Sequence, residues 1–166
     1  YTEDFSSVID ANTNVQGFSG PGGFGYSATL PSGQLFYFDA GSLSTSRLNV
    51  PVTLTFTGTA VTAIGGNFYA IDNDDAFLSA PVTIGLSDGT TESLTPSGLA
   101  SSFRGFTSTV PITSLTFSSA AGGAFPTIDN LTIGTAIPNE SVPEPGTLAL
   151  LGLSLVGLMA TRRRKA

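Results

Sequence analysis

Short runs in which apolar residues alternate with threonine and serine limit this chain to β-structure. The segment 52–57 reads Val-Thr-Leu-Thr-Phe-Thr, so that every second side chain is apolar. Successive side chains of a strand point to opposite faces, and this period therefore predicts a strand with one buried and one solvated face. Further short strands are predicted at 1–10, 26–30, 34–39, 61–71, 82–86, 90–94, 102–107, 112–118 and 127–133.

Turn-forming residues separate these runs. Asp88-Gly89 lies between two predicted strands and is the strongest hairpin signal in the chain. Residues 11–25, rich in Asn, Gly and Pro, are predicted to form a loop. About ten short strands without a convincing helix predict an all-β fold, an antiparallel two-sheet β-sandwich of jelly-roll-like type, over residues 1–136.

Charge and composition exclude several functions. Residues 1–136 carry ten acidic residues against two basic ones, Arg47 and Arg104, which gives a net charge of −8. Nucleic-acid binding needs clustered Lys and Arg, so we exclude nucleic acid as a partner. The chain has no His and no Cys, so it cannot assemble a Ser-His-Asp or Cys-His catalytic site. A carboxylate pair of the glycosidase kind is the catalytic alternative, but half of the acids stand in turn-like contexts. We therefore expect a protein that is not an enzyme, and we expect Arg104 to pair with a surface acid.

The end of the chain has a different composition. A Pro-containing linker at 137–146 is followed by an apolar run at 147–160 and by the basic residues Arg162, Arg163, Arg164 and Lys165. The run predicts a short C-terminal hydrophobic helix, which with its basic stop occupies residues 147–166. Fourteen helical residues rise about 21 Å, and a helix of that length crosses a bilayer core of about 30 Å only with local thinning and snorkelling of its arginines. The basic end should stay in the cytoplasm, with the domain outside.

This order of features resembles the PEP-CTERM sorting signal of Gram-negative bacteria, with Pro143, Glu144 and Pro145 as its signature. The resemblance implies recognition and cleavage near these residues by the membrane protease-transpeptidase exosortase, with transient anchoring in the inner membrane. It also implies an exported protein that is released or attached to the cell surface and its exopolysaccharide. Because the sequence begins with Tyr1, we expect a secretory signal peptide to precede it.

Two groups of acidic residues are candidate calcium sites. Asp72, Asn73, Asp74 and Asp75 form a run dense in the oxygen ligands that Ca²⁺ prefers, although the EF-hand pattern is missing. The alternative is a solvated Asx-rich turn. Glu3 or Asp4 with Asp129 would form a second site if the first and last strands pair, as in the carbohydrate-binding jelly rolls that these strands resemble. Here the alternative is that Asp129 only satisfies nearby backbone groups.

Three functions remain open. The leading one is a structural or adhesive protein of the cell surface or extracellular matrix. The second is a calcium-dependent carbohydrate-binding module. Its candidate sugar-stacking rings are Phe18, Phe24, Tyr26, Tyr37 and Tyr69. The alternative is that these rings pack in the core. The third is a homo-oligomer, the subunit of a self-assembling extracellular fibre with the C-terminal helix in its core. Exposed aromatic rings on one sheet face would favour binding, and a smooth Ser/Thr face would favour structure.

Overall fold

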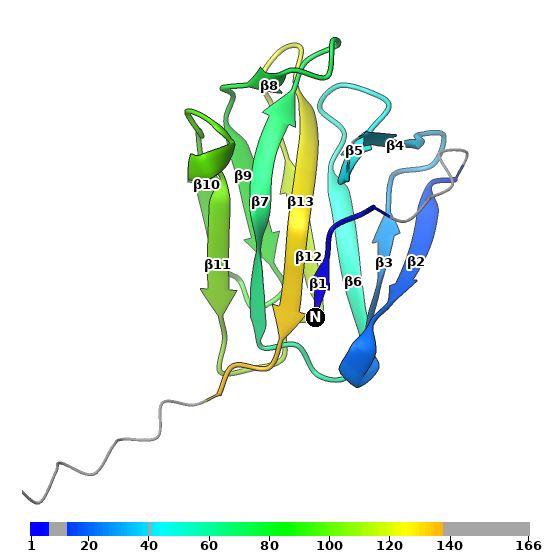
Figure 1. Cartoon of the computed structure of the whole chain (residues 1–166), viewed down its shortest axis with the longest axis vertical. Coiled ribbons are helices and arrows are strands. Elements are labelled where there is room, and N and C mark those ends of the chain that lie inside the picture. The colour runs from blue at the N-terminus through cyan, green and yellow to red at the C-terminus, as the bar shows by residue number, and fades with distance from the viewer. Residues whose placement is uncertain (7–12, 40, 138–166) are drawn as a thin grey trace, which may run out of the picture. The chain divides into compact units, whose positions relative to one another are not determined.

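The computed structural model describes residues 1–6, 13–39 and 41–137, which form an all-β fold. The chain divides into two units, Tyr1–Ala136 and Ile137–Ala166, and every strand of the described residues belongs to the first. Two antiparallel sheets face each other in this unit (Figure 1). The predicted all-β sandwich is confirmed, whereas its jelly-roll connectivity stays a prediction. The predicted C-terminal helix lies outside the described residues.

One layer is a six-stranded sheet, seen behind the other layer in Figure 1. All its neighbouring strands are antiparallel. In spatial order its strands are β10 (Thr91–Leu94), β9 (Val82–Leu86), β12 (Ser114–Ser118), β6 (Val52–Gly58), β3 (Phe24–Thr29) and β2 (Val15–Ser19).

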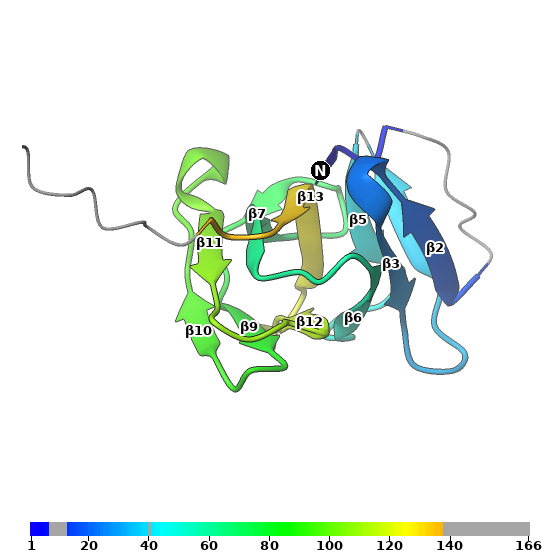
Figure 2. The same cartoon turned by 90° about the horizontal axis from the view of Figure 1, so that it is seen from below.

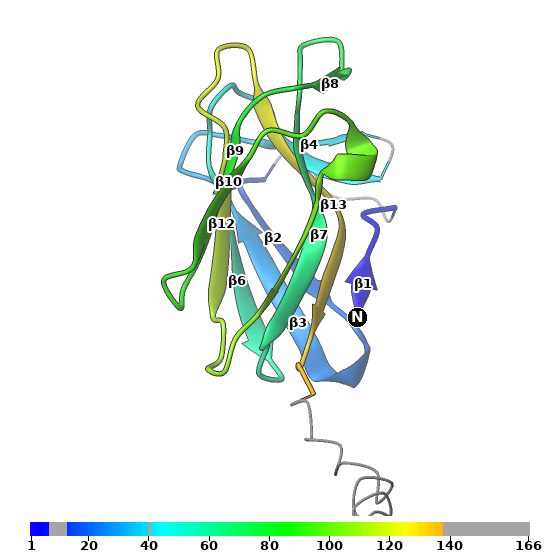
Figure 3. The same cartoon turned by 90° about the vertical axis from the view of Figure 1, so that its left-hand side faces the viewer.

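The other layer is a seven-stranded sheet centred on its two longest strands (Figure 3). Its main path runs β11 (Phe103–Thr107), β7 (Ala63–Ile71), β13 (Phe125–Gly134), β5 (Ser42–Thr45) and β4 (Phe36–Asp39). Two short strands complete it: β8 (Phe77–Leu78) pairs with β7, and β1 (Thr2–Glu3) pairs with β13. Short 3₁₀ turns, η1 (Pro21–Gly23) and η2 (Leu99–Ser101), precede β3 and β11.

The view along the strands shows the two layers one above the other (Figure 2), and the buried apolar side chains of the core lie between them. Val52 and Leu54 of β6 are fully buried, while the intervening threonines face outward, as the alternation predicts. Across the sandwich, the rings of Phe68 on β7 and Phe117 on β12 meet edge to face with centroids 5.9 Å apart. Burial of such apolar side chains supplies most of the driving force for folding.

Local geometry at two places sets the register. The predicted hairpin is present: Gly89 has φ +93°, and the Leu86 N–H donates to the Thr90 carbonyl at 2.8 Å. In β13 the register shifts between Asp129 and Thr132, and Asn130 has φ +50°. This bulge shifts the alternation by one residue. Ile128 before it and Leu131 after it both reach the core, while Asp129 stays on the outer face.

The prediction of a loop at 11–25 is wrong, because β2 lies within it. Only Phe18 of this edge strand packs well, with its ring stacked on Tyr26 at a centroid distance of 4.5 Å. Backbone pairing with β3, rather than an apolar period, therefore forms this strand. Two other strands, β5 and β8, also lie outside the predicted set.

Candidate functional site

The acidic loop between β7 and β8 is closed by its own side chains. The Asp72 carboxylate accepts the backbone N–H groups of Asp74 at 2.9 Å and Ala76 at 3.0 Å. The loop backbone adds two bonds, from Asp72 N–H to the Ala76 carbonyl and from Asp75 N–H to the Asp72 carbonyl. Asp75 has φ +59°, a conformation that Asp tolerates in turns. This is the geometry of an Asx-rich turn.

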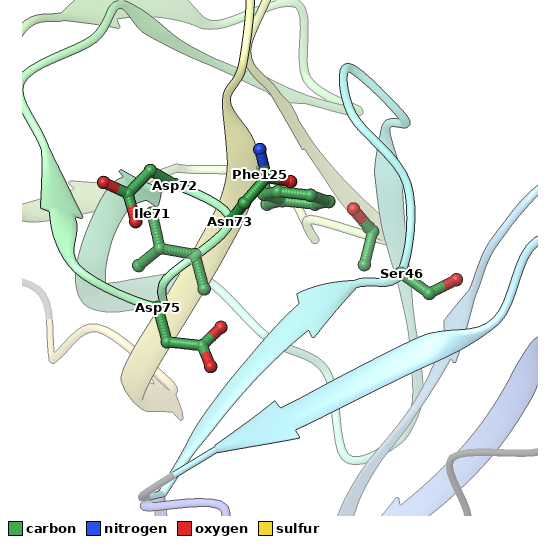
Figure 4. Close-up of a pocket in the computed structure, with 7 residues that line it drawn as sticks. Ser46, Ile71, Asp72, Asn73, Asp75 and Phe125 are labelled. Carbon is green, nitrogen blue, oxygen red and sulfur yellow. The ribbon is translucent and has the colours of Figure 1, made fainter.

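Beside this loop lies a pocket of about 240 Å³. It is lined by Thr45, Ser46, Ile71, Asp72, Asn73, Asp75 and Phe125. In Figure 4 the carboxylates of Asp72 and Asp75 point in different directions, whereas calcium needs six to eight converging oxygens. Among residues 1–6, 13–39 and 41–137, no three His, Cys, Asp or Glu side chains gather in a way that could hold a metal ion. Calcium at Asp72–Asp75 stays a prediction.

The second candidate calcium site lies where the first and last strands meet. The predicted pairing is present, with Thr2 opposite Thr132 and Glu3 opposite Leu131. The Glu3 carboxylate accepts the Tyr1 hydroxyl and, at 3.0 Å, the Phe5 N–H. Its neighbour Asp4 instead binds Ser6, through the backbone N–H at 3.0 Å and the hydroxyl at 2.7 Å.

Asp129, the third predicted ligand, is held by its neighbour. Its two carboxylate oxygens accept the backbone N–H and, at 2.9 Å, the side-chain amide of Asn130. Burial raises the pKa of Asp129 above its usual value against the effect of the Asn130 bond, and the charge of Asp4 adds to the rise. Donors from Ser6 lower the pKa of Asp4. The charges of Asp4 and Asp129 thus interact, but each carboxylate accepts hydrogen bonds from a residue close to it in sequence. Calcium at this site stays a prediction.

Most of the predicted stacking rings contribute to packing. Tyr26 and Tyr69 are buried, and Phe18 and Phe24 pack against the core. The side chain of Tyr37 lies outside the described residues.

Among the side chains that the structure describes, an exposed aromatic ring occurs at a position that the sequence pattern does not single out. Phe103 on edge strand β11 is 53% exposed. In the segment Phe103-Arg-Gly-Phe106 the two rings must face opposite sides of the strand, but the sequence does not indicate which one faces outward. In the structure Phe106 packs against the core.

The predicted ion pair of Arg104 is confirmed. Arg104 Nε lies 2.6 Å from Glu92 Oε1, and both side chains are partly exposed. Because Arg104 belongs to β11 and Glu92 to β10, the pair joins the edge strands of the two sheets.

Over strands β10, β9, β12, β6 and β3, the outer surface of the six-stranded sheet carries mainly small hydroxyl-bearing side chains, and we name this part the hydroxyl face. Thr53 and Thr116 share a hydrogen bond of 3.1 Å across β6 and β12, and Thr83 and Ser93 share one of 2.9 Å across β9 and β10. In the strands described, this face carries no charged side chain. Its members are Ser27, Thr29, Thr53, Thr55, Thr57, Thr83, Thr91, Ser93, Ser114, Thr116 and Ser118.

Comparison with protein families decides what the end of the chain is. Residues 141–165 match the PEP-CTERM protein-sorting motif. The chain carries a PEP-CTERM protein-sorting motif. No curated protein matches the chain.

The PEP-CTERM motif indicates a protein that is exported, processed by exosortase and directed to the cell surface or the extracellular space. The match includes Pro143-Glu144-Pro145 and the basic residues Arg162, Arg163, Arg164 and Lys165, all of which lie outside the described residues. In the part of the chain that the structure describes, no helix has the length and apolar character needed to cross a membrane.

Proposed function

We propose that this protein is a structural or adhesive component of the cell surface or extracellular matrix, associated with exopolysaccharide and without catalytic turnover. The sorting motif supports the destination. The hydroxyl face is the observation that carries the structural role, because a smooth, uncharged Ser/Thr surface across five strands favours a structural protein, whereas a binding module is expected to expose aromatic rings on a sheet face. The absence of His and Cys from the sequence supports the same proposal.

In this proposal the C-terminal helix anchors the chain transiently in the inner membrane, and cleavage near Pro143-Glu144-Pro145 frees the domain. The test is intact mass of the protein in membrane and extracellular fractions of the producing cell. We expect an outer species that ends near Pro145. Replacing Pro143, Glu144 and Pro145 by alanine should leave a full-length chain in the membrane fraction. A wild-type species that ends at Ala166 outside the cell would contradict the proposal.

Calcium-dependent carbohydrate binding is a second candidate, favoured by the pocket at the acidic loop. Its Asp, Asn, Ser and Thr side chains are hydrogen-bonding groups, and Phe125 adds an apolar wall. A calcium ion that binds only the folded protein would stabilise it and so raise Tm. At a free calcium concentration of 100 times Kd, the free energy of unfolding would increase by about 2.7 kcal/mol. Thermal unfolding in Ca²⁺, in Mg²⁺ and in chelator tests this, with Asp74→Asn as the loop variant. Equal Tm values in all three would exclude the metal.

A self-assembling fibre is the third candidate, and the hydroxyl face favours it. Two copies of a domain with a net charge of −8 repel each other. This repulsion is weakest when the copies meet through a surface that carries no charge. Light scattering at low and high salt tests assembly. A monomer at every concentration and salt would contradict it.

A further inference from the structure

Phe103 lies on the outer surface of the seven-stranded sheet, above two glycines. A Cβ atom on Gly65 would come within 3.0 Å of the ring, and one on Gly105 within 3.6 Å. Because neither glycine has a side chain, the ring can lie close to the sheet. A larger residue at either position would push the ring away from the strands. The Cε and Cζ atoms at the far end of the ring lie over the two glycines, and Phe103 remains 53% exposed.

Polar side chains continue the same row across the sheet. Phe103 is the register partner of Asn67 on β7, and Asn67 is the register partner of Asp129 on β13. Directly paired side chains of an antiparallel sheet lie on one face about 5 Å apart. The row thus places an aromatic ring, an amide and a carboxylate side by side, on the sheet turned to the viewer in Figure 1. We name Phe103, Asn67, Asp129, Asn130 and the two glycines the Phe103 platform.

Hydrogen bonds fix the polar part of this platform. Asn67 Nδ2 donates to the Ser102 hydroxyl at 3.0 Å, and Asn130 Nδ2 donates to Asp129 at 2.9 Å and to Asn67 Oδ1 at 3.4 Å. Each Asp129 oxygen accepts one bond from Asn130, and a carboxylate oxygen can accept two. The carboxylate therefore keeps capacity for two hydroxyl donors without moving.

A flat exposed ring beside fixed hydrogen-bonding groups suits a sugar, whose C–H face covers the ring while its hydroxyls reach the polar row. The charge selects a neutral sugar. Asp129 lies in the row, Asp4 is close enough to affect its pKa, and the domain has a net charge of −8, so that an anionic polymer would be repelled. Leu99 on η2, whose carbonyl accepts Asn67 Nδ2 at 3.4 Å, is also 53% exposed.

We propose that the Phe103 platform binds a neutral polysaccharide by stacking a sugar ring on Phe103 and bonding its hydroxyls to Asp129 and Asn130. This inference rests on the proposed association with exopolysaccharide and gives it a site. The site is separate from the acidic loop and requires no metal ion.

The test uses the released protein in native gels cast with one polysaccharide at a time. The neutral probes are a glucan, a mannan and a galactan, and the anionic probes are alginate and polygalacturonate. We expect at least one neutral polymer to retard the protein, in chelator as well as in calcium. No retardation by any neutral polymer, or retardation by anionic polymers alone, would overturn the proposal.

Two substitutions at one position separate stacking from simple cover of the glycines. Phe103→Tyr keeps the ring and should keep binding, whereas Phe103→Leu keeps apolar cover but loses the aromatic face and should weaken binding about tenfold or more, which corresponds to 1.4 kcal/mol. Val15→Ala, at a side chain of similar exposure (51%) on the other sheet, is the control and should change nothing. Equal binding by Phe103→Leu and wild type would exclude the platform.

Fractionation of the same strains separates the two proposals. All variants keep the sorting motif and should leave the cell. If Phe103→Leu stays in the matrix as firmly as wild type and no neutral polymer binds, the platform fails while the structural role stands. If wild type binds a neutral polymer but never reaches the outside of the cell, the proposed function fails while the platform stands.

Discussion

Gly58, the last residue of β6, provides the sharpest test of how the sandwich closes at this end. It has φ +78°, and a Cβ atom there would overlap the carbonyl oxygen of Gly23 and come within 3.3 Å of its carbonyl carbon. The adjoining Thr59 donates its N–H to Gly23 at 3.0 Å and its hydroxyl to the Gly22 carbonyl at 2.8 Å. An alanine at 58 would therefore push η1 away from β6 and strain both bonds.

The cost of Gly58→Ala follows from two contributions. An L-residue in the left-handed region costs about 1–2 kcal/mol, and loss of the two Thr59 hydrogen bonds costs about 1–3 kcal/mol more. Gly89 is the matched control, because it has φ +93° but nothing within 4 Å of an added Cβ. Gly89→Ala should therefore cost only the first contribution, about 1–2 kcal/mol.

Urea unfolding followed by circular dichroism measures both variants, and thermal unfolding gives a second readout. For a chain of this size, 1 kcal/mol lowers Tm by about 2–4 °C. We expect Gly58→Ala to be the less stable variant by at least about 1 kcal/mol, the lower bound for the two bonds. Equal stability of the two variants would refute the close approach of Gly23 to Gly58.

Three further predictions concern the core, the edge and the outer face. Leu54→Ala should lower the free energy of unfolding by about 2–5 kcal/mol, whereas Thr55→Ala, one residue on and outward, should change it by less than about 0.5 kcal/mol; urea unfolding measures both. Glu92→Gln should cost at most about 1 kcal/mol because the ion pair with Arg104 is partly exposed, and added salt should erase the difference from wild type. Burial raises the pKa of Asp129, so the folded state binds the proton of this carboxyl more tightly than the unfolded state does. The stability that the protonated carboxyl contributes is therefore lost as pH rises through the folded-state pKa. Asp129→Asn should therefore gain stability relative to wild type between about pH 3 and about pH 7, and a constant difference in urea unfolding across this range would contradict the shift.

The alternation of apolar and hydroxyl residues predicts the strands whose two faces differ. It places Val52 and Leu54 in the core, while the turn residues Asp88-Gly89 locate the hairpin. It cannot find β5, whose four residues Ser42–Thr45 are all buried. There the Ser44 hydroxyl donates to the Pro126 carbonyl at 3.2 Å and accepts from Thr127 at 2.9 Å. A serine buried through bonds to distant residues looks, in sequence, like a serine in water.

The candidate sites show the same limit. Sequence locates the acidic loop, but the role of Asp72 depends on which backbone N–H groups its carboxylate reaches. Sequence also suggests that the first and last strands pair, and they do. It cannot place Phe103 beside Asn67 and Asp129, because these residues belong to three strands whose register is set by the bulge in β13 and by pairing across the sheet.

The position of β13 has a consequence for the order of events during export. This strand lies inside its sheet, with β7 on one side and β5 and β1 on the other, yet it is the last strand of the domain to be synthesised. Its contacts with β1 join residues more than 120 positions apart, and such distant pairings form late. The sheet therefore cannot close before β13 is available to pair, and the sorting motif begins only seven residues after Gly134, at 141. The sandwich can thus be complete only once the chain is available almost up to its sorting motif.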